Sequence, residues 1–214
     1  MHRIIMKNED ILLEENNKLD IKDNSDIVIY LTGKGTTEIN IGQNCNVTIN
    51  HLVIDKTNEI TINLNKENSK ILYNYSIINY KDHYLKMTIN HNSDNTESNV
   101  YNHGVNVKTN KLKFDITGIV PKNIKKCICN QENRIININD GISTICPNLL
   151  IDSYDIVSSH AAYIGKFNKD ILFYLMSRGL NKSKAYELLI TSFLLPININ
   201  KDKVKKFVEE LENI

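Results

Sequence analysis

Short runs of alternating apolar and polar residues fill most of this chain, from about residue 27 to residue 165. The runs are rich in β-branched residues and are separated by clusters of Asn, Asp, Gly and Lys. An alternation of period two is typical of β-strands, because successive side chains of a strand point to opposite faces. The pattern therefore predicts a mainly β protein. The alternating apolar positions are Ile27, Ile29, Leu31, Ile39, Ile41, Val47, Ile49, Ile60, Ile62, Leu64, Ile71, Tyr73, Tyr75, Leu85, Met87, Ile89, Val105, Val107, Leu112, Phe114, Ile116, Ile136 and Ile138.

Strands of this kind fit two architectures. An all-β sandwich or barrel would bury one face of each strand against another part of the sheet. A β-solenoid would instead bury the inward side chains of each coil against the neighbouring coils. The sequence has no strict repeat, so a solenoid would be irregular, and periodicity alone does not separate the two.

The alternation stops at Gly165, and apolar residues then recur at helical spacing. Asn168 is a suitable N-cap for a first helix, which Gly179 would end. Ser183 is a suitable N-cap for a second helix, which Pro196 would end. The end of the chain therefore predicts helices rather than strands.

A third helix is expected from Lys201 onward. Residues 1–25 are polar and weakly patterned, and they predict one short helix or strand. The chain thus divides into a short N-terminal segment (1–25), a β core (26–166) and a C-terminal helical subdomain (167–214).

Composition excludes several classes of protein. The net charge of the 214 residues is +1 and Trp is absent, which argues against a nucleic-acid partner. No apolar run is long enough for a membrane span or a signal peptide, so we expect a cytoplasmic protein without a membrane partner. Cysteines in a reducing cytosol are expected as free thiols or ligands. The abundance of Asn, Ile and Lys is interpreted as coding bias, so a single Asn carries little information.

Five segments occur in a characteristic order between Asn90 and Phe193, about half of the chain. They are NHNSDNTES with HGV (90–98 and 103–105), KFDITGIV (113–120), NQENRIININD (130–140), PNLLIDSYDIVSSHAAYIG (147–165) and LFYLMSRGL (172–180). In order and spacing these segments resemble the core domain of the SufB/SufD family, the scaffold proteins of iron–sulfur cluster assembly. The last two segments are the most specific.

The resemblance implies a right-handed parallel β-helix followed by a C-terminal helical subdomain, which favours the solenoid over the sandwich. It also implies a non-enzymatic scaffold subunit of a SUF-type complex that works with a SufC-like ABC ATPase. Such a subunit would pair through its β-helix edges with itself or with a SufB-like subunit. An iron–sulfur cluster would then be held transiently near the interface.

The chain departs from the family at three points. Members of the family extend further on the N-terminal side. The usual Ser-His-Gly-Ala reads Ser159-His-Ala-Ala162 here, and the segment that carries a cysteine in SufB reads Glu132-Asn-Arg-Ile135. The chain therefore resembles SufD, or a compact member from a minimal system, and the SufB cysteine is not carried over.

His160 is the first candidate ligand for iron, because it matches the motif histidine and a neutral imidazole is a common metal ligand. Cys127 and Cys129 are two residues apart and would share one face of a strand. Cys146 lies 19 residues after Cys127, about one coil later, and thiolates are the usual ligands of iron–sulfur clusters. The alternative is that these cysteines are small buried apolar residues.

The remaining histidines and Cys45 are expected to be structural or superficial. His91 and His103 fall in the resembling region, where a structural role is expected, whereas His51 and His83 are expected at the surface. The sequence contains no phosphate-binding Gly-rich loop, no nucleophile elbow and no zinc-protease motif.

The two expected helices present apolar side chains that would pack on the end of the β core. The resemblance implies a second use for them, the docking of the ATPase. The residues assigned to this surface are Leu172, Phe173, Leu175, Met176, Arg178, Leu189 and Phe193.

Three other functions are alternatives to this one. A β-helix enzyme acting on polysaccharide would need a carboxylate-lined groove, and the carboxylates here show no such spacing. A cupin-like metal barrel would need several histidines at close strand spacing, which are not seen. A purely structural SufD-like partner that binds no cluster stays open.

Overall fold

The computed structural model describes residues 1–195, which form strands up to Gly165 and two helices after it. The expected third helix from Lys201 lies outside the described residues. The helices are α1 (Lys169–Ser177) and α2 (Lys182–Leu194). The strands are β1 (His2–Ile5), β2 (Glu9–Leu13), β3 (Asn16–Ile21), β4 (Asp26–Gly33), β5 (Gly35–Ile41), β6 (Asn46–Ile54), β7 (Asn58–Leu64), β8 (Lys70–Asn79), β9 (His83–His91), β10 (Glu97–Asn106), β11 (Lys111–Val120), β12 (Cys127–Asn137), β13 (Ile142–Ile151) and β14 (Ile156–Gly165).

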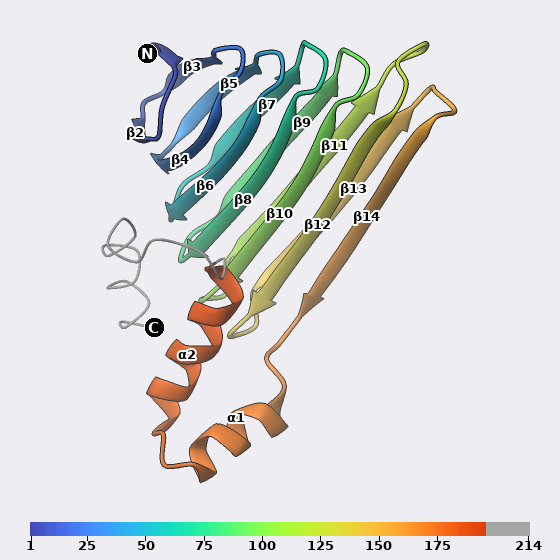
Figure 1. Cartoon of the computed structure of the whole chain (residues 1–214). Helices are drawn as coiled ribbons and strands as arrows, with labels where there is room; N and C mark the ends of the chain where they lie inside the picture. Colours follow the sequence, from blue (N-terminus) through green and yellow to red (C-terminus); the bar gives the residue numbers. More distant parts are fainter. Residues whose placement is uncertain (196–214) are drawn as a thin grey trace.

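The strands form two seven-stranded parallel sheets that share one winding chain (Figure 1). Odd-numbered strands make one sheet and even-numbered strands the other, so each coil gives one strand to each sheet. This topology is a β-solenoid, which confirms the architecture that the resemblance favours and excludes the sandwich. Residues 1–25, for which the sequence predicts a single short element, contain β1, β2 and β3.

The coils become longer toward the C-terminal end. His2 pairs with Lys18, 16 residues later, whereas Lys111 pairs with Ile142, 31 residues later. The strands lengthen together with the coils, from 4 residues in β1 to 10 residues in β13. The solenoid is therefore narrow at its N-terminal end and wide at its C-terminal end (Figure 1).

The lumen between the sheets is the main core. Side chains at equivalent positions of successive coils stack in columns, of which Leu19, Ile39, Ile62 and Ile89 form one. All four are buried, as the alternation predicts for Ile39, Ile62 and Ile89, whereas Leu19 lies in the segment for which the sequence predicts little pattern. Burial of such apolar side chains contributes the larger part of the folding free energy.

One corner of the solenoid repeats the same backbone turn in five coils. Asn24, Asn44, Asn68 and Asn95 have φ between 54° and 61°, and Lys126 takes the next equivalent position with φ 56°. This left-handed conformation suits Asn and is strained for most other residues with a side chain. The asparagines thus have a conformational role that the interpretation as coding bias missed.

Lys126→Asn is expected to stabilise the protein by about 0.5–1 kcal/mol, because Asn adopts the left-handed conformation at lower cost than Lys. Denaturant unfolding measures the change. Lys125→Asn, at an exposed neighbour without positive φ, is the matched control and should stay within about 0.5 kcal/mol of the parent. A Lys126 variant no more stable than the control would contradict the strain argument.

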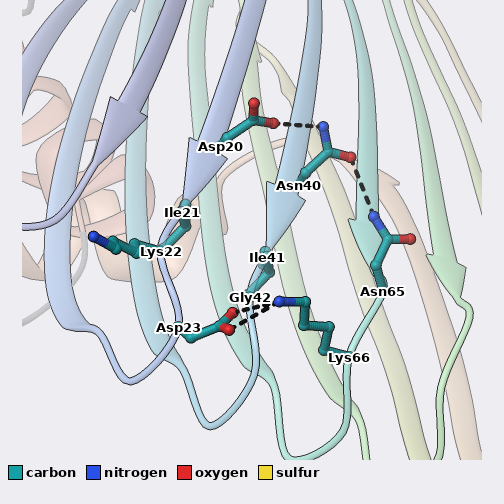
Figure 2. A pocket seen from close by; sticks show the side chains of 9 residues that line it. All are labelled: Asp20, Ile21, Lys22, Asp23, Asn40, Ile41, Gly42, Asn65 and Lys66. Carbon is teal, nitrogen blue, oxygen red and sulfur yellow. Dashed lines mark hydrogen bonds and ion pairs between the residues drawn. The ribbon is translucent and has the colours of Figure 1, made fainter.

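Amide side chains also form ladders on the outer faces. On the odd-numbered sheet Asn40 donates to Asp20, Asn63 to Asn40 and Asn90 to Asn63, at 2.8, 2.9 and 2.8 Å between in-register residues. Figure 2 shows the start of this ladder beside the Lys66 ammonium, which contacts both oxygens of Asp23. These ladders hold neighbouring coils in register.

The helices begin at asparagine caps. The Asn168 side chain accepts from the backbone N–H of Asp170, as the sequence predicts, and Gly179 follows α1 with φ 96°. Helix α2 is capped by Asn181, whose side chain accepts from Lys184 N–H, so the expectation of Ser183 as the cap was wrong. Asn181 has the extended backbone of an N-cap, with φ −69° and ψ 164°, whereas Ser183 already lies inside the helix. Within residues 1–195 no helix is long and apolar enough to span a membrane.

Helix α2 packs on the outer face of the even-numbered sheet and forms a second core. Its Ile190 and Leu194 are buried against Ile78, Val105 and Ile136 of the sheet. This contact fixes the helical hairpin beside the wide end of the solenoid (Figure 1).

Candidate functional site

The wide end of the solenoid is open. Strands β13 and β14 are the last strands of the two sheets, so one side of each has no neighbouring strand within the described residues. Most of β14 is exposed, including the apolar Val157 at 64%. An exposed edge strand of ten residues presents unpaired backbone N–H and C=O groups to any strand that approaches it.

His160 lies at the centre of this edge. It pairs in register with Gln131 of β12, whose side chain faces the lumen. In-register neighbours of a parallel sheet point to the same face, so His160 faces the lumen side at its open mouth. Its side chain is exposed because no described coil covers β14. Ser158, two residues earlier, lies on the same face above Cys129.

The four predicted ligands do not come together. Cys127 and Cys129 are buried inside the lumen, 1% and 2% exposed, one coil before His160. Cys146 is half-buried on β13 in register with the outward-facing Asp115, which places it on the outer face of the other sheet. Within residues 1–195 no group of three or more His, Cys, Asp and Glu side chains is placed to hold a metal ion. Their role as ligands stays a prediction.

The two lumenal thiols belong to a hydrogen-bonded chain centred on His91. Nδ1 of His91 lies 2.7 Å from the Thr96 hydroxyl and Nε2 lies 2.9 Å from the Ser98 hydroxyl. The Thr96 hydroxyl lies 3.2 Å from Cys127 Sγ, and Ser98 is hydrogen-bonded to Cys129. His91 is thus buried and structural, as the sequence predicts.

Burial sets the protonation states of His91 and Cys129 in this hydrogen-bonded group. It lowers the pKa of His91 to about 4 and raises the pKa of the Cys129 thiol, although the hydrogen bond from Ser98 acts in the opposite direction. At neutral pH the imidazole is therefore uncharged and the Cys129 thiol is protonated. A thiol binds iron as a thiolate, so burial disfavours the form of Cys129 that would bind iron.

Cys127 also has a structural explanation. Its neighbour Ile128 is in register with one residue in each earlier coil of the same sheet. The residues directly before those in-register positions are Ser25, Cys45, Ser69 and Thr96, so Cys127 takes the equivalent place in its own coil. Each of these side chains lies close to a backbone carbonyl of the corner turn. A thiol at this place substitutes for a hydroxyl, and the strand register rather than the spacing of cysteines is the signal that identifies it.

His51 was expected at the surface, and this was wrong. It is fully buried in the lumen, where Nδ1 lies 2.9 Å from the Tyr73 hydroxyl and Nε2 has no partner. The alternation places it inward, in register between Leu31 and Tyr75, and this register decides its burial. Burial lowers the pKa of His51 to about 3.

Helix α1 contains no buried residue. Of the side chains assigned to partner docking, Phe173, Met176 and Arg178 are exposed, whereas Leu172 and Leu175 are half-buried. Leu189 is half-buried on α2, and Phe193 packs on the solenoid. Three further apolar residues of this hairpin, outside the predicted docking set, are exposed: Ile171, Tyr174 and Leu188.

The geometry defines the class of protein. It is a parallel β-solenoid whose wide end is open within the described residues, and an apolar helical hairpin follows the last strand. Residues 10–193 match the family described as "SUF system FeS cluster assembly, SufBD core domain". The chain belongs to this family.

Three relatives illustrate the similarity. The chain is 33% identical over 103 residues to the iron-sulfur cluster assembly protein SufD of Bacillus subtilis (strain 168), which covers 48% of this chain and 24% of that protein. It is 43% identical over 65 residues to a SufBD family protein of Pyrococcus horikoshii, covering 30% and 14%. It is 37% identical over 83 residues to one of Mycobacterium leprae, covering 38% and 21%. The matched segments thus span a quarter or less of each relative.

Proposed function

We propose that this protein is a non-enzymatic scaffold subunit of a SUF-type iron–sulfur cluster assembly complex. The observation that carries the proposal is the open wide end, where His160 lies at the centre of β14, an edge strand that pairs with β12 on one side and has no described neighbour on the other. Membership of the SufBD core family supports the same role, since the family takes part in cluster assembly.

The edge fits a second subunit. Strand β14, ten residues long, offers one unpaired backbone edge together with exposed Val157, Tyr163 and Ile164. Pairing with a strand of another copy, or of a SufB-like subunit, would satisfy the backbone groups and bury the apolar side chains. The new interface would enclose His160.

The cluster is cargo in this proposal. His160 provides one ligand from this chain, and the partner subunit provides others across the interface. Cys127 and Cys129 lie one coil deeper and would join only after the end coil moves. A second candidate function is a subunit that supports the complex without binding a cluster. The separation of the three cysteines from His160 favours this second function.

The partner ATPase would dock on the helical hairpin. Phe173 is 75% exposed on α1, which also exposes Ile171, Tyr174 and Met176, and the Arg178 guanidinium lies 5.2 Å from the centre of the Tyr174 ring. An apolar helix face with an aromatic–arginine pair has the composition of interaction hot spots. ATP hydrolysis would move this hairpin and, through α2, the wide end of the solenoid.

Co-purification with an ABC-type ATPase from a cell that contains one tests the partnership. Phe173→Asp is expected to weaken binding at least about tenfold, the usual effect of losing an interface anchor. Ile4→Asp is the matched control, because Ile4 is 66% exposed at the narrow end. Absence of the ATPase from the wild-type preparation, or equal binding by the two variants, would overturn the docking assignment.

Anaerobic reconstitution with iron and sulfide tests the ligand. We expect His160→Ala to lose the cluster absorbance of the assembled complex, because the imidazole is the ligand that this chain brings to the interface. Ser158→Ala on the same face is the control and should keep it. If His160→Ala keeps the full spectrum, the supporting role without a cluster is the correct one.

A further inference from the structure

Two backbone carbonyls at the C-terminal end of α2 are capped by side chains of the solenoid. The Ser76 hydroxyl of β8 donates to the Leu194 carbonyl, and Nδ1 of His103 on β10 lies 2.8 Å from the carbonyl oxygen of Phe193. The last carbonyls of a helix have no partner within the helix and need such caps. These two contacts tie the end of α2 to the even-numbered sheet.

The other ring nitrogen of His103 faces a second acceptor. Nε2 lies 3.3 Å from Oε1 of Glu132, and the same carboxylate pairs with the Arg134 guanidinium at 2.9 Å. The imidazole ring also stacks on Phe193, with 4.8 Å between ring centres and 12° between planes. His103 is therefore held between an acidic side chain of β12 and the end of α2.

The charged imidazole suits this position better than the neutral one. Only the imidazolium carries a donor on both nitrogens, so a neutral ring leaves one lone pair facing an oxygen atom. A positive charge at a helix C-terminus is also stabilised by the helix dipole. Among the described residues, the ionisable groups facing His103 are Glu132 with its partner Arg134, and the nearby Tyr101 on β10, while β8 presents Ser76 and α2 a carbonyl and a phenyl ring.

We propose that His103 is a proton-responsive latch for α2. When its imidazole is charged, it holds the C-terminal end of α2 on the outer face of the solenoid. When the ring loses its proton, one of the two contacts is lost and this end of the helix loosens. The latch therefore weakens as the pH rises and the ring gives up its proton.

The latch is a property of this chain and does not depend on a partner. If α1 and α2 dock the ATPase, the latch also sets how firmly that docking surface is held, and this step rests on the proposed function. Failure of the latch and absence of an ATPase partner are then separate results, because the first is measured on the isolated protein.

Hydrogen–deuterium exchange of the full chain at pH 6 and pH 8, corrected for the intrinsic exchange rates, tests the latch. In the wild type the protection of amides in 182–195 is expected to fall about tenfold from pH 6 to pH 8, the scale of a helix-terminal charge contact. His103→Gln is always uncharged and should show low protection at both pH values. His103→Arg is always charged and should show high protection at both.

His2→Gln is the matched control, because His2 also pairs with a carboxylate, Asp20 at 2.6 Å, far from α2. It should keep the wild-type pH profile. A wild-type profile without pH dependence, or equal α2 protection in the Gln and Arg variants, would overturn the proposal. Peptides from the core strand β4 should keep the same protection in every variant.

Discussion

Acidification from pH 7 to about pH 3 is expected to lower the free energy of unfolding by on the order of 3 kcal/mol for each of two buried histidines. Burial lowers the pKa of His51 to about 3 and that of His91 to about 4, from an ordinary value of 6.5. Below pH 6.5 the two histidines therefore bind protons in the unfolded chain but stay uncharged in the folded chain. Stability falls as the pH drops through the interval from 6.5 to the folded values, and levels off below them.

Urea unfolding at pH 7, 5 and 4 measures this loss. The matched variant is His51→Leu combined with Tyr73→Phe, which removes both partners of the buried hydrogen bond and the unpaired Nε2. Replacing both partners by apolar groups is expected to be close to neutral at pH 7. The variant should lose less stability in acid than the wild type.

Carboxylates contribute to acid sensitivity as well, and the variant separates the two effects. The pKa values of Asp20 and Asp23 are lowered mainly by hydrogen bonds from Asn40 and Lys66 respectively, and both groups are unchanged in the double variant. Identical pH dependence in the wild type and the double variant would assign the acid loss to carboxylates and contradict the role of His51.

Phe114→Ala is expected to cost about 3–5 kcal/mol, the range for removing a buried aromatic ring. Phe114 is 0% exposed and crosses the lumen from the odd-numbered sheet. Its ring makes an edge contact with Tyr75, at 6.1 Å between centres, and Tyr75 in turn contacts His51 at 5.2 Å. Loss of the ring leaves a cavity between the sheets that the long strands cannot close.

The same substitution at the surface is the control. Phe173→Ala, at a residue that is 75% exposed on α1, should change the free energy of unfolding by less than about 0.5 kcal/mol. Phe114→Leu should cost less than Phe114→Ala, because it keeps most of the buried volume. Equal stability of the two alanine variants in denaturant unfolding would show that the lumen is not closely packed at Phe114.

The alternating pattern was enough to predict the lumen but not the polar columns. Ile29, Leu31 and Tyr73 are buried as expected, because the period of two fixes which face a residue occupies. The inward histidine His51 and the asparagine ladders were missed, since both depend on which residue lies above which in the next coil. Coil lengths that vary from 16 to 31 residues hide this register from the sequence.

The candidate site shows the same limit. The sequence located His160 near the end of the solenoid, and its place on the edge strand follows from being in the last run of alternation. The spacing of Cys127 and Cys146 suggested that they stack one coil apart, but Cys127 faces the lumen from β12 and Cys146 lies on the outer face of β13. Spacing along the chain does not specify the sheet to which a strand belongs when each coil contributes two.

The taper of the solenoid makes its two ends unequal, and this limits how copies can assemble. The narrow end offers β1 and β2, of four and five residues, whereas the wide end offers two strands of ten. A narrow end placed on a wide end would leave about half of the long strands unpaired, so head-to-tail growth into a fibre gains little. Two wide ends would match over their full length. The gradual lengthening of the coils thus makes the wide end a better geometric match for a second wide end than for the first coil of this chain.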